Sequence, residues 1–312
     1  MPKEGEDILE EEALVFKPSL WIGRHKKYKD VPLHVCNALT HLRQIPHRFQ
    51  SSFPSPELPV LDFINLQLPI QSAELITTKI EHVFSFDAPQ MDVQAFLRRS
   101  IPPIAFIDKV EKEVGQAWFD GKVAIVDPRF SNSNNTLPFW ALTYWRQMSK
   151  IIKAQHDWMD ARAWIQTEVT KSSISHPLLL EHELLTTCGW NVPLPRTVTM
   201  VPGMTTHTLS QFLSNRWLDQ EAMDLMISHL QKRLRQDGIR SKKVMIASCQ
   251  FFSVLYDAAK TNRYSNEAIF SSLWNIEARV KEGLRYLYIP VFGNHHEIAA
   301  YVDFDLRKIG YG

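Results

Sequence analysis

Two largely apolar runs lie near the C-terminal end of the chain. Residues 286–292 are almost all apolar and β-prone, and residues 297–304 are rich in small, aromatic and branched side chains. A short polar turn that begins at Gly293-Asn294 separates the two runs. The pattern therefore predicts two paired, buried strands, with a third strand beginning before the last printed residue.

Helical periodicity precedes these strands. The first amphipathic helix is expected to begin at Asp219, a good N-cap, with Glu221 in its first turn, and to end at Gly238. Two further helices are expected at about 245–259 and 266–280. Helices followed by a sheet predict an α+β domain. The apolar face expected for the first helix consists of Met223, Met226, Ile227, Leu230 and Leu234.

The preceding part of the chain reads as mostly helical. Residues 139–169 contain no Pro or Gly and predict one long helix with a core or partner-helix face. Shorter helices are expected at 92–99, at 179–187 and at 208–213. The apolar residues that recur near helical spacing in the long helix are Trp145, Met148, Ile152, Met159 and Ile165.

The remaining stretches have weaker signals. Residues 1–12 are acidic and predict a disordered tail, and repeated prolines make 13–60 loop-rich. Residues 61–85 hold one short helix or strand, which the pattern does not decide. Residues 116–127 predict a hairpin with Asp120-Gly121 as its two-residue turn. The predicted divisions are a tail (1–12), a mostly helical region (13–200) and an α+β domain (205–312).

The composition favours an intracellular protein, nuclear or cytoplasmic. The formal net charge of +1 gives no electrostatic case for a nucleic-acid partner, and the basic run 24–29 is more typical of a solvated turn. Cys36, Cys188 and Cys249 are widely spaced, which argues against a disulfide framework and a structural zinc site. The acidic N-terminus is no secretory signal, and no uncharged apolar run approaches the roughly 18 residues of a membrane span. We expect a soluble protein without a cofactor.

His182-Glu183 invites comparison with the helix motif of zinc proteases. That motif needs a second histidine four residues after the first, so that both imidazoles share one helix face. Thr186 occupies that position, so no metal site is predicted.

His296 stands where the second C-terminal strand begins, next to the turn. A histidine held by a rigid strand at the rim of a sheet is well placed to act as a general base. A histidine of a surface turn is the alternative that this fragment leaves open.

Trp217 and His296 together carry a resemblance to the ubiquitin-like-modifier (SUMO) protease family of cysteine peptidases. The family begins its catalytic domain with a Trp-Leu-Asn-Asp-Glu-type motif, which stands here as Trp-Leu-Asp-Gln-Glu from Trp217. It continues with aromatic residues in the next helix, here Phe251-Phe252. The family pattern then continues with a strand that contains Ile/Val-Pro-Ile, a turn, the catalytic histidine and a strand that ends in Val-Asp-Phe. These stand here as Ile289-Pro290-Val291, His296 and Val302-Asp303-Phe304, so that the resemblance covers about 205–312.

The resemblance implies a papain-like cysteine-protease domain, incomplete in this sequence, with helices followed by a mixed sheet that is cut short. His296 would deprotonate the nucleophilic thiol, and Trp217 would cover the Gly-Gly tail of the modifier in a narrow tunnel. The implied partner is a ubiquitin-like modifier or its conjugate, and the implied reaction is processing or deconjugation after Gly-Gly. A packing role for Trp217 at the start of its helix is the alternative.

The sequence departs from the family pattern at three points. Glu297 follows the histidine where the family usually has tryptophan, and Gln220 stands where an aspartate helps to hold the modifier. The aspartate that orients the histidine in the family would fall just beyond Gly312. The oxyanion-hole glutamine and the nucleophilic cysteine would come later still.

Residues within the chain do not replace these groups. Asp303 is seven positions from His296 on one predicted strand, hence on the opposite face and about 23 Å away. Asp305 is about 30 Å away along the strand, and Glu297 is adjacent and faces away. Cys249 reads as part of a helix core, where a thiol is unreactive, and Cys188 is more exposed but no better supported.

Two hypotheses of different classes follow. The first is a cysteine-type peptidase of the ubiquitin-like-modifier protease class, whose printed chain lacks the catalytic Asp and Cys. The second is a catalytically inactive fragment that acts as a protein-interaction module through its helical region, above all the helix 139–169. A scaffold unrelated to proteases is a third, weaker alternative.

Overall fold

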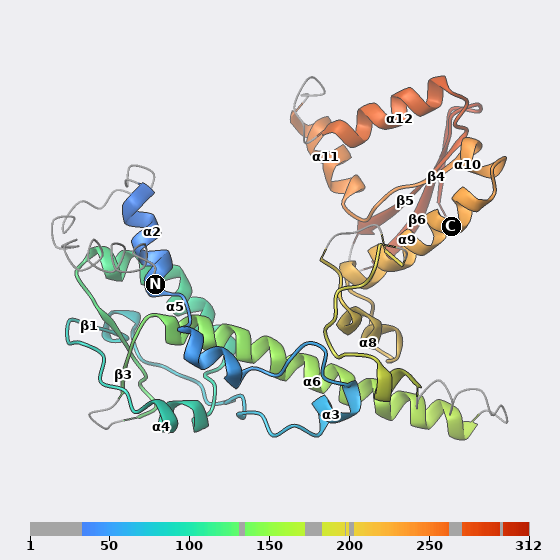
Figure 1. Cartoon of the computed structure of the whole chain (residues 1–312). Coiled ribbons are helices and arrows are strands. Elements are labelled where there is room, and N and C mark those ends of the chain that lie inside the picture. The colour runs from blue at the N-terminus through green and yellow to red at the C-terminus, as the bar shows by residue number, and fades with distance from the viewer. Residues whose placement is uncertain are drawn as a thin grey trace, which may run out of the picture. The chain divides into compact units, whose positions relative to one another are not determined.

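The protein is a mixture of α-helices and β-strands in two compact units, which confirms the predicted α+β class (Figure 1). Our computed structural model describes residues 33–130, 135–171, 183–196, 198–199, 203–261, 270–293 and 296–311. The first unit is Met1–Ser55 with Asp62–His156, and the second is Pro56–Leu61 with Asp157–Gly312. The predicted tail, the basic run 24–29, the turn residue Asn294 and His182 lie outside the described residues. The division of the chain at 200–205 stays a prediction.

The first unit combines helices with a small antiparallel sheet of order β1-β2-β3. Its core forms where helices α5 and α6 bring fully buried aromatic and branched side chains together, among them Ile107, Tyr144 and Trp145. The elements are α2 (Leu33–Leu42), η3 (His47–Ser52), the last part of α3 (Val60–Ile64), η4 (Ile80–His82), β1 (Phe84–Ser85), α4 (Val93–Arg98), α5 (Ile104–Phe119), β2 (Ala124–Val126), β3 (Thr136–Leu137) and the first part of α6 (Trp140–Lys171).

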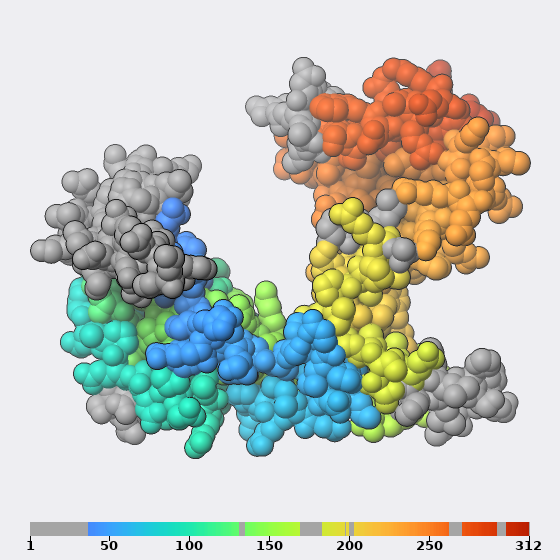
Figure 2. Space-filling model, viewed as in Figure 1, coloured from blue at the N-terminus to red at the C-terminus, as the bar shows by residue number. Residues whose placement is uncertain are grey.

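Helix α6 confirms the long helix predicted at 139–169. Trp145, Met148, Ile152 and Ile165 are buried as expected, whereas Met159 is exposed, so the predicted apolar face is wrong at that position. Segments from the N-terminal end of the described chain contact α6, and Figure 2 draws these segments in blue and light blue. The Phe49 and Trp140 rings stack with centroids 4.7 Å apart, and Gln155 Nε2 donates to the carbonyl oxygens of Phe63 and Leu66 at 2.8 Å each.

Two predictions for this unit are wrong. No hairpin spans 116–127, because α5 continues to Phe119 and β2 pairs with β1 and β3. Asp120-Gly121 is instead the end of a helix: Gly121 has φ +88°, and the Lys122 N–H bonds to Ala117 O at 3.0 Å, as in a Schellman motif. The loop-rich reading of 13–60 also missed α2, which fits between Pro32 and Pro46. The helix predicted at 92–99 is confirmed as α4, and the undecided stretch 61–85 contains parts of α3, η4 and β1.

The second unit ends in a four-stranded mixed sheet of order β4-β5-β6-β7, in which β4 is parallel to β5 and the other pairs are antiparallel. The predicted C-terminal strands are thus confirmed. Before the sheet, residues 183–187 are helical, as expected for the end of the helix at 179–187. The elements are η5 (Thr206–Thr208), α8 (Leu209–Phe212), α9 (Gln220–Gln236), α10 (Arg240–Lys243), β4 (Val244–Ile246), α11 (Phe251–Thr261), α12 (Ser271–Lys281), β5 (Tyr286–Gly293), β6 (His296–Asp303) and β7 (Lys308–Tyr311).

Helices lie on both sides of this sheet. Figure 1 shows α11 and α12 on one side of the strands and α9 with α10 on the other. Phe251, Ile276, Leu287 and Ile289 share the core on the α11–α12 side. A smaller cluster, Met223, Ile227 and Cys249 with Leu218 and Ile246 packed against it, fills the α9 side.

Two details of the C-terminal predictions are wrong. Residues 245–259 do not form one helix, because Val244–Ile246 pairs with β5 as strand β4 and α11 begins only at Phe251. Strand pairing with β5 overrides the helical periodicity of this stretch. In α9, Met226 and Leu230 are exposed, and Ala222 and Leu225 are buried beside Met223 and Ile227.

Candidate functional site

Trp217 lies in the turn before α9 and is 86% exposed. Full burial of an aromatic side chain removes about 150–250 Å² from water, which is worth roughly 4–6 kcal/mol. The fold leaves most of this stabilisation unused, although the next residue, Leu218, packs against Met223 and Ile227. The alternative in which Trp217 serves as a core-packing residue therefore does not fit its position.

The turn that presents Trp217 is fixed on its C-terminal side by Asp219. The Asp219 side chain accepts a hydrogen bond of 3.0 Å from the Ala222 N–H and caps α9, as predicted. Its other oxygen accepts a bond of 2.6 Å from Gln211 Nε2, and Gln211 Oε1 accepts the Asp219 N–H at 3.0 Å. One glutamine thus holds both the side chain and the backbone of the capping residue.

The same turn is fixed on its N-terminal side by helix α6. Arg216 Nη1 donates to Asp157 Oδ1 at 2.8 Å, and Arg216 Nη2 pairs with Asp160. Trp164 Nε1 donates to Asn215 Oδ1 at 3.1 Å. Residues on both sides of Trp217 are therefore tied to structured elements, while its own ring is open to solvent.

These supporting residues were not identified from the sequence. Asp157 lies 59 positions before Arg216, and Gln211 lies eight before Asp219, a spacing that belongs to no local motif. Gln220, which departs from the family's aspartate, is exposed as the first residue of α9.

His296 is the first residue of β6, as predicted, and its backbone pairs with Gly293. Asp303 is the last residue of the same strand and pairs with Tyr286. The two residues therefore occupy opposite ends of β6, which confirms that Asp303 cannot orient His296. Trp217 and His296 come from separate elements of the same unit.

Asp303 has a structural role at the β6–β7 connection. Its Oδ1 accepts the N–H groups of Asp305 and Leu306 at 3.0 and 3.1 Å, and Arg285 Nη2 lies 3.6 Å from its Oδ2. Burial by itself raises the pKa of the Asp303 carboxyl. The bond from Leu306, the charge of Arg285 and the bond from Asp305 together outweigh burial and hold this pKa below its usual value.

Neither Cys188 nor Cys249 is placed as an activated nucleophile. Cys249 is buried beside Met223 and Ile227, and its N–H donates to Asp224 Oδ1 at 3.0 Å. Cys188 is half-buried, and burial raises the pKa of its thiol in spite of a hydrogen bond with Thr206. A raised pKa reduces the thiolate fraction at neutral pH, which is the opposite of nucleophile activation.

Among the described residues, no cluster of three or more His, Cys, Asp or Glu side chains could hold a metal ion. None of the described helices is both long enough and apolar enough to cross a membrane.

Comparisons with protein-family models, with curated proteins and with solved structures give no match. The candidate site therefore rests on the geometry around Trp217 and on the strand that carries His296.

Proposed function

We propose that this chain supplies the histidine base and the aromatic tail-binding residue of a cysteine-type peptidase of the ubiquitin-like-modifier protease class, with a papain-like arrangement in its C-terminal region. The observation that carries the proposal is the 86% exposure of Trp217 on a turn held by Gln211 and Arg216. A nuclear or cytoplasmic location goes with this proposal.

The exposed ring suits a ligand without side chains. An aromatic face that closes over a Gly-Gly tail contacts the peptide backbone directly, and any larger residue would clash with it. His296 would take the proton of a cysteine thiol, and the thiolate would attack the carbonyl carbon of the terminal glycine. As the C–N bond breaks, His296 would return the proton to the leaving amine of the conjugate. Water would then hydrolyse the thioester and release the carboxylate of the modifier and the thiol. Trp217 would hold the tail in place for that attack.

The register of the last two strands supports a place for an orienting aspartate. Tyr311 pairs with Ala300, so continuation of this register would put the second position after Tyr311 opposite Ile298. Positions 296 and 298 share one face of a strand, and diagonal neighbours across an antiparallel pair lie within about 7–8 Å. The resemblance expects the family's aspartate at this position, so it would come near His296.

A binding experiment tests the role of Trp217. A SUMO-like modifier ending in Gly-Gly is titrated against the chain, its Trp217→Ala variant and, as the matched control, Trp274→Ala on α12, which is also exposed. We expect Trp217→Ala to weaken binding by tenfold or more, about 1.4 kcal/mol, and Trp274→Ala to leave it unchanged. Equal losses in both variants, or equal binding of a modifier that lacks the two glycines, would contradict the proposal.

A second experiment tests the chemistry. For the chain as printed we expect no covalent labelling by a modifier vinyl sulfone. In a longer polypeptide that adds the family's Asp and Cys, labelling should appear and should be lost with His296→Ala. Labelling of the printed chain that survives Cys249→Ser and disappears with Cys188→Ser would overturn our assignment.

An inactive protein-interaction module is the second candidate function, and the apolar surface of β7 favours it. Ile309 and Tyr311 are 77% and 82% exposed on this last strand of the sheet. If the chain binds the modifier as an inactive module through β7, Ile309→Lys with Tyr311→Lys should abolish modifier binding while Trp217→Ala leaves it intact. The peptidase proposal predicts the reverse order of effects.

A further inference from the structure

A pocket of about 590 Å³ lies in the second unit between the C-terminal ends of α9 and α12, and we call it the α9–α12 pocket. This volume falls within the roughly 300–1,000 Å³ of small-molecule sites. Trp217 does not line it. The lining residues used below are Leu234 and Arg235 of α9, Lys242 of α10, Val244 and Ile246 of β4, and Arg279 of α12.

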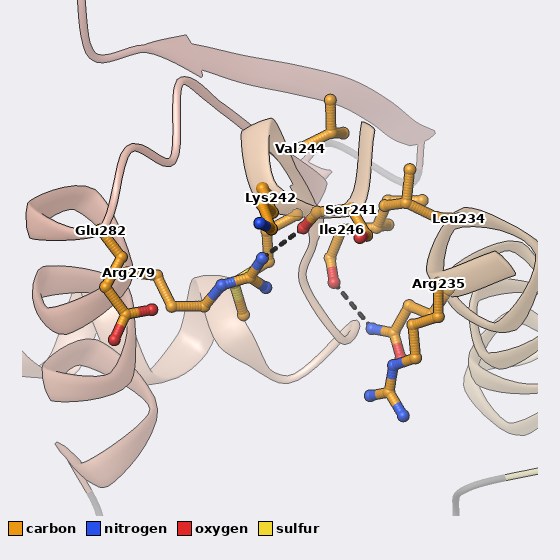
Figure 3. Close-up of a pocket in the computed structure, with 10 residues that line it drawn as sticks. Leu234, Arg235, Ser241, Lys242, Val244, Ile246, Arg279 and Glu282 are labelled. Atoms are coloured by element: carbon orange, nitrogen blue, oxygen red, sulfur yellow. Dashed lines mark hydrogen bonds between the residues drawn. The ribbon is translucent and has the colours of Figure 1, made fainter. Parts of the chain in front are cut away.

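The walls of the α9–α12 pocket are held in place by two hydrogen bonds from side chain to backbone, drawn in Figure 3. Gln231 Nε2 donates to Ile246 O at 2.7 Å and joins α9 to β4. Arg279 Nη2 donates to Ser241 O at 2.6 Å and joins α12 to α10. The pocket is therefore formed by the fold before any ligand binds, which lowers the cost of binding.

Three cations from three different elements line the pocket: Arg235, Lys242 and Arg279. Within the described part of the chain, none of them forms an ion pair with a carboxylate, whereas nearby Arg240, Lys281 and Arg285 do. Glu282 is the one acidic residue of the lining. The pocket thus carries an excess of positive charge.

Helix dipoles account for part of this charge. Arg235 and Arg279 lie in the last turns of α9 and α12, where cations are favourable. The dipoles of α9 and α12 do not explain why Lys242 also lines the pocket, because Lys242 belongs to the four-residue helix α10. A phosphate group suits this lining, because it is a compact anion with several acceptor oxygens. The donors that face it are the guanidinium groups of Arg235 and Arg279, the ammonium group of Lys242 and the polar Ser241.

The lining also includes the aliphatic side chains of Leu234, Val244 and Ile246, and the pocket is larger than a bare phosphate group needs. We infer that the α9–α12 pocket binds an organic phosphomonoester, whose phosphate contacts Arg235, Lys242 and Arg279 and whose apolar body contacts these aliphatic side chains. The inference goes beyond the proposed peptidase function and stands or falls independently of it.

Calorimetric titration of the full chain with phenyl phosphate tests this site. Arg279 also braces the fold, so the informative variant is Arg235→Gln with Lys242→Gln, whose side chains are exposed. We expect this double variant to lose about tenfold or more in affinity without a change in melting temperature. Lys243→Gln is the matched control, because Lys243 is the exposed neighbour of Lys242 but does not line the pocket.

Three results would overturn the inference. They are the absence of saturable binding, an equal loss in Lys243→Gln and the double variant, and an affinity for inorganic phosphate equal to that for phenyl phosphate. A nucleoside monophosphate and a phosphotyrosine peptide form two further arms, and preferential binding of either supports the site and identifies the source of the phosphate.

Discussion

Arg216 donates a hydrogen bond of 2.8 Å to Asp157, which joins the turn that presents Trp217 to helix α6. Asp157 is nearly buried, and His207 Nε2 lies 3.1 Å from its second oxygen. Asp160, one turn further along α6, pairs with the same guanidinium. The position of an exposed tryptophan thus depends on acidic residues of a helix that precedes it by more than fifty positions in the sequence.

Arg216→Ala should loosen this turn without unfolding the protein. Arg216 is largely exposed, so we expect its loss to reduce the free energy of unfolding by about 1 kcal/mol or less. Amide hydrogen exchange in residues 213–218 should accelerate, because the turn loses its tie to α6. The matched control is Arg240→Ala, which removes an exposed pair with Asp237 and should leave this exchange unchanged. Unaltered exchange in Arg216→Ala would contradict the bracing role.

Asp219→Ala should destabilise α9 through its cap. The variant removes the acceptor of the Ala222 N–H and of Gln211 Nε2, and loss of an N-cap costs typically about 1 kcal/mol. Asp219→Asn retains an acceptor for the Ala222 N–H and should restore most of the loss. Denaturant midpoints of the three proteins provide the measurement. An Asn variant as unstable as the Ala variant would assign the effect to the negative charge or to the Gln211 bond, which Asn also loses, rather than to capping.

Local signals predicted the elements whose stability depends on local chemistry. The cap at Asp219 and the paired β5 and β6 follow from residue type and spacing alone. The prediction failed where distant pairing decides the outcome: Val244–Ile246 becomes a strand only because β5 lies beside it. It also failed at Asp120-Gly121, since the same dipeptide serves a hairpin turn and a helix C-terminus.

The candidate site shows the same limit. Trp217 and His296 were identified from motifs in the sequence, and the structure describes their elements as expected. Gln211, Asp157 and Asp160 carry no local signature, because their role arises from contacts between segments that fold together. No sequence pattern pointed to the α9–α12 pocket either, whose cations come from three elements.

Asp303 should make the C-terminal sheet sensitive to acid. Its folded-state pKa is lowered, so it contributes stability that is fully present above the ordinary aspartate pKa of about 3.9 and is lost as the pH falls through the lower folded value. Asp303→Asn should remove this acid dependence. The acid dependence is measured as the protection of the Asp305 and Leu306 amides from hydrogen exchange at a series of acidic pH values. The control is Asp87→Asn in an exposed loop, which should leave this dependence unchanged. The same acid dependence in Asp303→Asn and the parent protein would assign it to another group.

Tyr144 should make the first unit sensitive to alkali. Burial between Phe53 and Phe96 raises the pKa of its phenol to about 12, against a smaller opposite effect of the hydrogen bond with Ser52. The folded state therefore disfavours the phenolate, and the stability from Tyr144 is fully present below its unfolded pKa of about 10 and is lost as the pH rises towards about 12. Tyr144→Phe should flatten the decline in denaturant midpoint over this range, while Tyr256→Phe, which changes an exposed tyrosine, should not. A decline that persists unchanged in Tyr144→Phe would show that another group controls the alkaline transition.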